Sequence, residues 1–195
     1  MLFKRKSYQD LDKIYFWTAT IHEWYPILDD HDNKKMMIEF LQHFHNAKLI
    51  TIYGFVLMPN HIHLIWKQND RNGQEMPLSS FMKYTAKKLL VYAEESGISS
   101  LFKIMASNKI HQIWKRDSLA IELFSRKVVR QKLDYIHSNP IVGKWKLAKD
   151  DISYYYSSAK FYETGIDDFG FLTDLFCEFD GDQNLPRPRK VLESI

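Results

Sequence analysis

The first part of the chain alternates apolar runs with amphipathic stretches. Residues 14–21 are rich in aromatic and β-branched side chains, which is typical of a strand. Between residues 32 and 47, apolar side chains recur at helical spacing and predict a helix. Aspartates stand where this helix should begin, and each has a side chain suited to the N-cap: Asp29, Asp30 and Asp32.

Two further apolar runs, at residues 49–58 and 61–67, are separated by Pro59-Asn60, a pair that favours a turn. They predict two strands that form a hairpin. A helix is then predicted over residues 77–95, because Pro77 suits a first helical turn and Gly97 suits a stop. Its expected buried stripe consists of Phe81, Tyr84, Leu89 and Tyr92.

A third helix is predicted over residues 126–138. Ser125 is a suitable N-cap, and Pro140 disfavours helical geometry at Asn139. A further strand should precede this helix. Residues 112–115 and residues 119–124 both fit it, and the pattern does not choose between them.

This order of elements gives a βαββαβ plan followed by one more helix. The predicted fold class is α+β, with a ferredoxin-like or RRM-like antiparallel sheet that carries two helices on one face and the third helix on the other. A chain of 195 residues fits one domain, here residues 1–162. Residues 181–189 are polar and proline-rich, so residues 163–195 are expected to form a partly flexible C-terminal extension.

The composition indicates the cellular compartment more clearly than it indicates the function. The chain has 27 Lys and Arg against 24 Asp and Glu, so net charge alone does not indicate nucleic acid, although basic residues gather between positions 103 and 130. Cys177 is the single cysteine, which excludes an intramolecular disulfide and a cysteine-based zinc site. No apolar run approaches membrane-spanning length, and we expect a soluble protein of the reducing cytoplasm.

The first chemical signal is the pair His61 and His63 on a predicted strand. Side chains two residues apart in a strand lie on the same face, so both imidazoles can converge on one metal ion. The pair supplies two ligands of a site and needs a third.

The second signal is the pair Tyr135 and Asn139 at the end of the third helix. Residues four apart share a helix face, so the phenol and the amide can point the same way. His137 is two residues from Tyr135 and should point elsewhere, as a structural or DNA-facing residue. A helix laid across the open sheet face would bring Tyr135 and Asn139 beside the histidines, which together supply three ligands and a nucleophile.

The residues carrying these signals resemble those of a known family, the HUH single-tyrosine transposases, and within it the REP-associated tyrosine transposases. The resemblance rests on GFVLMPNHIHLI at 54–65 and LDYIHSNPIVG at 133–143, with YSSA at 156–159 as a weaker match. It spans roughly residues 14–162. The loop at Gly143 reads GKWK in place of the usual GLV, which weakens the subfamily assignment but not the implied chemistry.

The resemblance implies that His61, His63 and Asn139 bind a divalent metal and that Tyr135 is the nucleophile. It implies cleavage and rejoining of single-stranded DNA at hairpin-forming sequences through a 5′-phosphotyrosine, with Mg²⁺ or Mn²⁺, in a protein that forms a homodimer and is nucleoid-associated when bound to DNA. Two imidazoles and an amide would by their chemistry suit Zn²⁺, Mn²⁺ or Ni²⁺ better than Mg²⁺, so the metal stays open.

Basic side chains on the second and third helices and before the third helix are candidates to bind DNA phosphates. They are Lys83, Lys87, Lys88, Lys115, Arg116, Arg126, Lys127 and Arg130.

Two other functions fit the same pattern. A non-catalytic module could bind single-stranded nucleic acid on an RRM-like sheet, and it would tolerate loss of Tyr135. A metal-dependent phosphoesterase with a water nucleophile would need the histidines but not the tyrosine.

Overall fold

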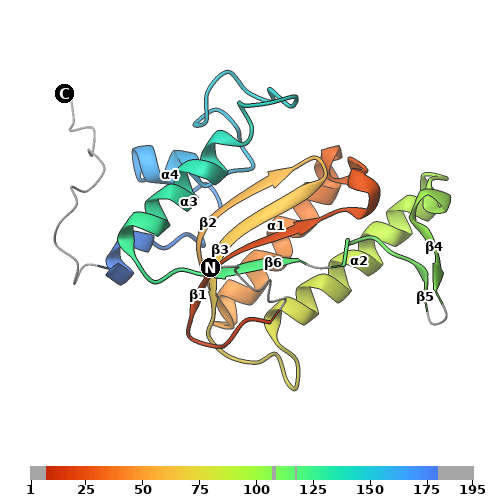
Figure 1. Cartoon of the computed structure of the whole chain (residues 1–195), viewed down its shortest axis with the longest axis horizontal. Helices are drawn as coiled ribbons and strands as arrows, with labels where there is room; N and C mark the ends of the chain where they lie inside the picture. Colours follow the sequence, from red (N-terminus) through yellow and green to blue (C-terminus); the bar gives the residue numbers. More distant parts are fainter. Residues whose placement is uncertain (1–7, 107–108, 117, 180–195) are drawn as a thin grey trace, which may run out of the picture.

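The computed structural model describes residues 8–106, 109–116 and 118–179. Its central feature is an antiparallel sheet with the strand order β2-β3-β1-β6 (Figure 1). This is the order of a ferredoxin-like sheet, and it confirms the predicted fold class. The strands are β1 (Ile14–Thr20), β2 (Ile50–Met58), β3 (His61–Gln68) and β6 (Leu119–Glu122).

Three long helices flank this sheet. They are α1 (His31–Asn46), α2 (Pro77–Glu95) and α3 (Arg126–Ser138), all within two residues of the predicted bounds. The shorter elements are η1 (His22–Trp24), η2 (Ile27–Asp29), η3 (Ser99–Phe102), α4 (Ala159–Thr164), η4 (Leu175–Phe179) and the small hairpin β4 (Lys103–Ala106) and β5 (Lys109–His111).

Some of the capping residues predicted from the sequence cap the helices in the structure. Asp30, one of the three candidates, is the N-cap of α1, and its carboxylate accepts a hydrogen bond from the Asn33 amide at 3.0 Å. Gly97 ends α2 with a φ of 71°, the left-handed conformation that favours glycine. Ser125 occupies the N-cap position of α3, but its side chain makes no capping hydrogen bond.

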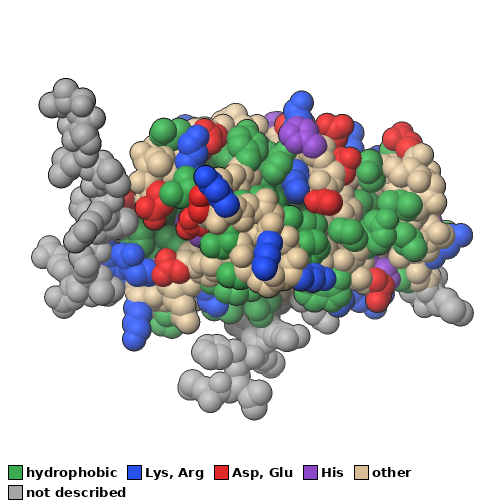
Figure 2. Space-filling model, turned by 90° about the horizontal axis from the view of Figure 1, so that it is seen from above, with side chains coloured by type: hydrophobic (Ala, Val, Ile, Leu, Met, Phe, Trp, Pro, Cys, Tyr) green, Lys and Arg blue, Asp and Glu red, His purple; other side chains and the backbone are tan. Residues whose placement is uncertain are grey.

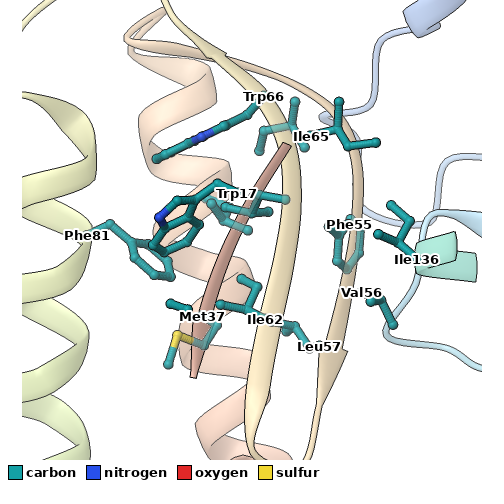
Figure 3. Close-up of a cluster of buried hydrophobic side chains, with 14 of the residues drawn as sticks. Trp17, Met37, Phe55, Val56, Leu57, Ile62, Ile65, Trp66, Phe81 and Ile136 are labelled. Carbon is teal, nitrogen blue, oxygen red and sulfur yellow. The ribbon is translucent and has the colours of Figure 1, made fainter. Parts of the chain in front are cut away.

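Alternation along the strands divides the core between the two faces of the sheet. Trp17 of β1 packs against Trp66 of β3 and Phe81 of α2, at ring-centroid distances of 5.7 and 5.8 Å. Figure 3 shows these side chains together on one side of the strands, whereas Ile136 of α3 lies on the other side. The sheet is therefore covered by α1 and α2 on one face and by α3 on the other.

The predicted buried stripe of α2 is correct for Phe81 and Leu89 and wrong for Tyr84, which is 43% exposed. Thr85 takes that place in the core, where its hydroxyl donates to the Phe81 carbonyl and accepts from the Trp114 indole. A small polar residue can be buried in a helix when its hydroxyl bonds the preceding turn.

The fourth strand of the sheet is β6, so the second of the two candidate segments is the strand. The first candidate segment lies against the end of β1: Trp114 forms an isolated bridge with Ile21, and the Lys115 amide donates to the Thr20 carbonyl at 2.7 Å. Both segments thus touch β1, which explains why the sequence pattern suited both. The hairpin β4–β5 was not predicted, because its strands are too short to show alternation.

The chain after α3 returns to the free edge of β2. Ser157 forms a bridge with Val56, and Ser158 donates its amide to the Phe55 carbonyl at 3.0 Å. Further on, Phe169, Phe171, Leu175 and Phe176 are buried, so part of the predicted extension packs into the core. The remainder of the predicted extension, 180–195, lies outside the described residues. No helix in the described ranges has the length and hydropathy required to span a membrane.

Candidate active site

Strand alternation places His61 and His63 on the face of the sheet that α3 covers. In the register of the sheet, His63 lies opposite Thr18 of β1 and His61 lies opposite Thr20. The two imidazole rings are 4.8 Å apart between centroids, and both side chains are buried. The sheet therefore presents two adjacent imidazoles to the space beneath α3, as the sequence predicted.

The helix α3 approaches this face closely because β2 has a glycine beneath it. A Cβ atom on Gly54 would lie 2.9 Å from Leu133 Cδ2 and 3.3 Å from Ile136 Cδ1, closer than ordinary van der Waals contact. The approach brings the ring of Tyr135 to 5.3 Å from the ring of His63. Tyr135 remains 49% exposed, so its hydroxyl can be reached from solvent.

Asn139 lies one turn after Tyr135, at the C-cap of α3. Its φ of −51° and ψ of −44° are helical, so the expectation that Pro140 would remove it from helical geometry is wrong. Its side-chain amide donates to the Tyr135 carbonyl at 2.9 Å, which satisfies one of the last carbonyls of the helix. The extra helical residue keeps Asn139 on the Tyr135 face, where its side chain lines the pocket together with His61.

These side chains line an open pocket of about 640 Å³ between the sheet, α3 and the segment before β6. The lining residues are Phe16, Thr18, Thr20, Trp24, His61, His63, Lys115, Arg116, Ser118, Leu119, Lys132, Tyr135 and Asn139. The two pairs of residues singled out in the sequence therefore meet in one pocket, within a single chain.

The tautomer of His61 is fixed by its neighbour Asn60. The Asn60 amide nitrogen donates to the Trp24 carbonyl at 3.0 Å, so its oxygen faces His61 Nδ1 at 2.7 Å. An amide oxygen only accepts, so Nδ1 of His61 must carry the proton. Nε2 then holds the free lone pair that a metal ligand needs.

His63 has a similar arrangement. Its Nδ1 lies 2.7 Å from the Thr18 hydroxyl, and its Nε2 is buried without a hydrogen-bond partner among the described residues. A buried nitrogen without a partner is costly unless another group satisfies it. The donor set fits a divalent metal, which would take up this nitrogen together with His61 Nε2.

The candidate for a third protein ligand is an amide. The described residues contain no cluster of three or more His, Cys, Asp or Glu side chains able to hold a metal. Asn139 is the amide that lines the pocket, whereas the Asn60 oxygen is already engaged with His61 Nδ1.

Burial holds both imidazoles neutral at physiological pH. It lowers the pKa of His61 to about 4, against a smaller opposing effect of the neighbouring Asn139 side chain. It lowers the pKa of His63 to about 3, and the positive charge of His61 and Lys132 acts in the same direction. Neutral imidazoles are the form that binds metal ions.

His137 has a structural role, which is one of the two readings that the sequence left open. Its Nε2 lies 2.9 Å from the Ser158 hydroxyl, which in turn accepts from the Phe55 amide at 3.0 Å. Burial lowers the pKa of His137 to about 4. The residue ties α3 to β2 through Ser158 and does not reach the pocket.

Of the eight basic residues proposed for DNA, the structure brings Lys115 and Arg116 to the pocket. It adds Lys132, whose Nζ lies 4.7 Å from the Phe16 ring centroid and 5.9 Å from that of Tyr135. Lys132 was not among the residues predicted from the sequence, although its place three residues before Tyr135 on the predicted helix was a usable signal.

The other six candidates lie away from the pocket. Arg126 and Arg130 stack on Phe176, at 5.1 and 5.0 Å from its ring centroid, and Lys127 is exposed on the same helix. Lys83, Lys87 and Lys88 project from α2 on the opposite face of the sheet, and Lys83 pairs there with Glu75. On the face seen in Figure 2, Lys and Arg side chains are interspersed with Asp and Glu, so surface charge alone marks no binding site there.

Comparison with solved structures bears on the fold around this pocket. The chain is similar to a REP-associated tyrosine transposase bound to a REP hairpin, with a TM-score of 0.55 and 16% sequence identity over 98% of this chain and 100% of that one. The chain has the fold of a tyrosine transposase.

The other comparisons add little to this. A candidate transposase from Deinococcus radiodurans R1 overlaps at 13% identity and a TM-score of 0.40, over 70% of this chain and 97% of that one, which is too slight to bear on the fold. No protein-family model and no curated protein matches the sequence.

Proposed function

We propose that the chain is a metal-dependent DNA strand transferase that cuts and rejoins single-stranded DNA through Tyr135. One observation carries the proposal: Tyr135 lies beside His63, whose buried Nε2 lacks a partner among the described residues, in a pocket that also holds His61 and Asn139. A nucleophile next to a set of metal donors is an arrangement suited to phosphoryl transfer to a side chain.

In the proposed reaction, the Tyr135 hydroxyl oxygen attacks a backbone phosphorus. The bond from phosphorus to the tyrosine oxygen forms and the bond to the 3′ oxygen breaks, which leaves a 5′-phosphotyrosine and a free 3′-hydroxyl. The phenol proton is lost as the 3′ oxygen gains one. Attack by a 3′-hydroxyl on the phosphotyrosine reverses the step and rejoins a strand, since the phosphodiester energy is kept in the covalent link.

His61, His63 and Asn139 would hold the divalent ion, proposed as Mg²⁺ or Mn²⁺, with Zn²⁺ as an alternative. When bound, such an ion polarises the scissile phosphate and offsets the charge that develops on it. Lys132 adds a fixed positive charge beside Tyr135, where the phosphate must sit. Lys115 and Arg116, which also line the pocket, would hold the flanking backbone.

Single-stranded DNA at hairpin-forming sequences is the proposed substrate. The structural neighbour that shares this fold was determined with a REP hairpin bound, which supports DNA as the partner. The proposed site of action is the nucleoid. The pocket takes its tyrosine and both histidines from one chain, so the proposed homodimer is not needed to complete it.

The test is a covalent capture assay with labelled single-stranded hairpin DNAs and Mn²⁺ or Mg²⁺. We expect the wild-type chain to form a protein–DNA adduct that survives denaturation, and Tyr135→Phe to form none. Tyr155→Phe is the matched control, because Tyr155 is a comparably exposed tyrosine, 56% exposed, outside the pocket.

Other outcomes would favour the alternatives. Cleavage by both wild type and Tyr135→Phe would indicate a water nucleophile and contradict the proposal. Binding without cleavage across a broad set of hairpins would favour a non-catalytic module on the RRM-like sheet.

A further inference from the structure

Trp24 is the aromatic wall of the pocket that the proposed chemistry does not use. Its side chain is 53% exposed, and its indole meets the His61 ring edge to face at 6.4 Å between centroids. By contrast, the side chains of Trp17, Trp66 and Trp114 are buried in the core. An indole that is half exposed at the edge of a metal-binding set is placed to contact whatever enters the pocket.

The backbone holds the indole there in an uncommon conformation. Glu23 and Trp24 have φ values of 49° and 57°, in the left-handed region that residues with side chains rarely adopt. Two hydrogen bonds fix the turn: the Trp24 amide donates to the Ile21 carbonyl, and the Asn60 amide donates to the Trp24 carbonyl, each at 3.0 Å. Strained residues of this kind concentrate at ligand-binding sites.

A cation accompanies the ring. Lys115 Nζ lies 5.0 Å from the Trp24 ring centroid, and both residues line the pocket. An exposed indole next to a lysine is the combination by which proteins hold an unpaired nucleotide, with the base on the ring and the phosphate on the cation. Because Asn60 contacts both His61 and the Trp24 carbonyl, the ring and the proposed metal ligand are fixed to each other.

We propose that Trp24 stacks an unpaired base of the nucleotide beside the scissile phosphate, and that Lys115 neutralises the phosphate of that nucleotide. This subsite rests on the proposed function, since it positions the strand that Tyr135 attacks. Stacking accepts any base, so Trp24 requires that the nucleotide be unpaired and does not read its identity. The ligand class is an extrahelical or single-stranded nucleotide next to a hairpin.

The experiment is an abasic scan in the Tyr135→Phe background, which keeps the ring and blocks the proposed cleavage. The probe is a DNA hairpin with a short single-stranded extension, in which each extension base is removed in turn. With Trp24 present, we expect removal of one particular base to weaken binding about tenfold, as one lost base–aromatic stack should. Intact DNA should quench the tryptophan fluorescence more than that abasic probe does.

Trp24→Ala should weaken binding of the intact probe by a similar factor and abolish the sensitivity to that one abasic position. Trp24→Phe should keep part of the sensitivity, and Phe124→Ala, which removes a 76% exposed ring outside the pocket, should keep all of it. Thermal melts of each variant check that it is folded. If Trp24→Ala does not fold, the scan and the quenching with Trp24 present decide the question.

The stacking proposal would be overturned if Trp24→Ala and each abasic position weakened binding additively. It would also be overturned if, with Trp24 present, removing any one base changed the binding affinity no more than removing any other. The capture assay separates this failure from failure of the proposed function. If an adduct forms but the abasic effect does not depend on Trp24, only the proposed subsite is contradicted. If the abasic effect depends on Trp24 but no adduct forms, only the proposed strand-transfer reaction is contradicted.

Discussion

At the scale of single residues, the site depends on neighbours that orient the ligands as much as on the ligands themselves. Asn60 fixes the tautomer of His61 because its own orientation is set by the Trp24 carbonyl. Partners of this kind commonly alter metal affinity by 10- to 100-fold when removed, as a rough range. The sequence showed Asn60 only as a turn residue, since the partner that orients it is far away in the chain.

Asn60→Leu should weaken Mn²⁺ binding by roughly 10- to 100-fold, because His61 Nδ1 loses its acceptor and Nε2 is no longer held in the ligand form. Asn60→Asp is the matched control. It should bind Mn²⁺ at least tenfold more tightly than Asn60→Leu, since its carboxylate still accepts from Nδ1. Isothermal titration of the metal into each protein measures both. Equal affinities for wild type and Asn60→Leu would show that Asn60 does not position the histidine.

The candidate site residues His61, His63, Tyr135 and Asn139 could be predicted from the sequence, because the periods of strands and helices fix which side chains share a face. Thr18 and Trp24 could not be predicted in this way. Thr18 meets His63 only through the register of β1 and β3, which depends on packing across the whole sheet. Trp24 reaches the pocket through a left-handed turn that no local pattern announces.

At the scale of elements, the decisive feature is how closely α3 lies on β2. Gly54 makes the approach possible, and the position of Tyr135 over His63 follows from it. The resemblance motif contains this glycine, but its role appears only when Leu133 and Ile136 are seen above it.

Gly54→Val should lower the free energy of unfolding by roughly 1–3 kcal/mol, because the new side chain overpacks the contact between β2 and α3. It should also reduce adduct formation at temperatures where the protein is still folded, since α3 carries Tyr135. Chemical denaturation and the capture assay measure the two effects. Val142→Ala, a change at a 52% exposed apolar side chain, serves as a control. A stable Gly54→Val protein with full adduct formation would contradict this account of the interface.

Most elements could be predicted because their bounds coincide with strong local signals, such as Pro77 at the start of α2 and Gly97 after its end. The fourth strand could not be fixed in advance, because two adjacent apolar segments both lie against β1. The return of Ser157 and Ser158 to the edge of β2 is a long-range pairing, and the sequence around them carries no alternation that announces it.

At the scale of the whole molecule, three buried histidines couple stability to pH. Burial lowers the pKa of His61 and His137 to about 4 and that of His63 to about 3, whereas the unfolded chain titrates near 6.5. Below that pH the unfolded state binds protons that the folded state does not, so protonation favours unfolding. The contribution of these neutral histidines to the free energy of unfolding is therefore complete above pH 6.5, and it is lost as the pH falls toward their lowered pKa values.

We expect the metal-free protein to lose stability between pH 6.5 and 4, by up to about 1.4 kcal/mol per pH unit for each histidine involved. Unfolding measured by chemical denaturation across this range tests it. His137→Gln should give a shallower slope than wild type, because one of the three groups no longer titrates. A slope unchanged in His137→Gln would mean that His137 takes up its proton in the folded state.

The most direct test of the central claim is to identify the residue that carries DNA. The adduct formed by the wild-type chain on a single-stranded hairpin would be digested with protease and nuclease, and the modified peptide sequenced by mass spectrometry. The account predicts a nucleotide linked through its 5′ phosphate to the hydroxyl of Tyr135. A nucleotide on any other residue, or cleaved DNA with no modified peptide, would contradict it.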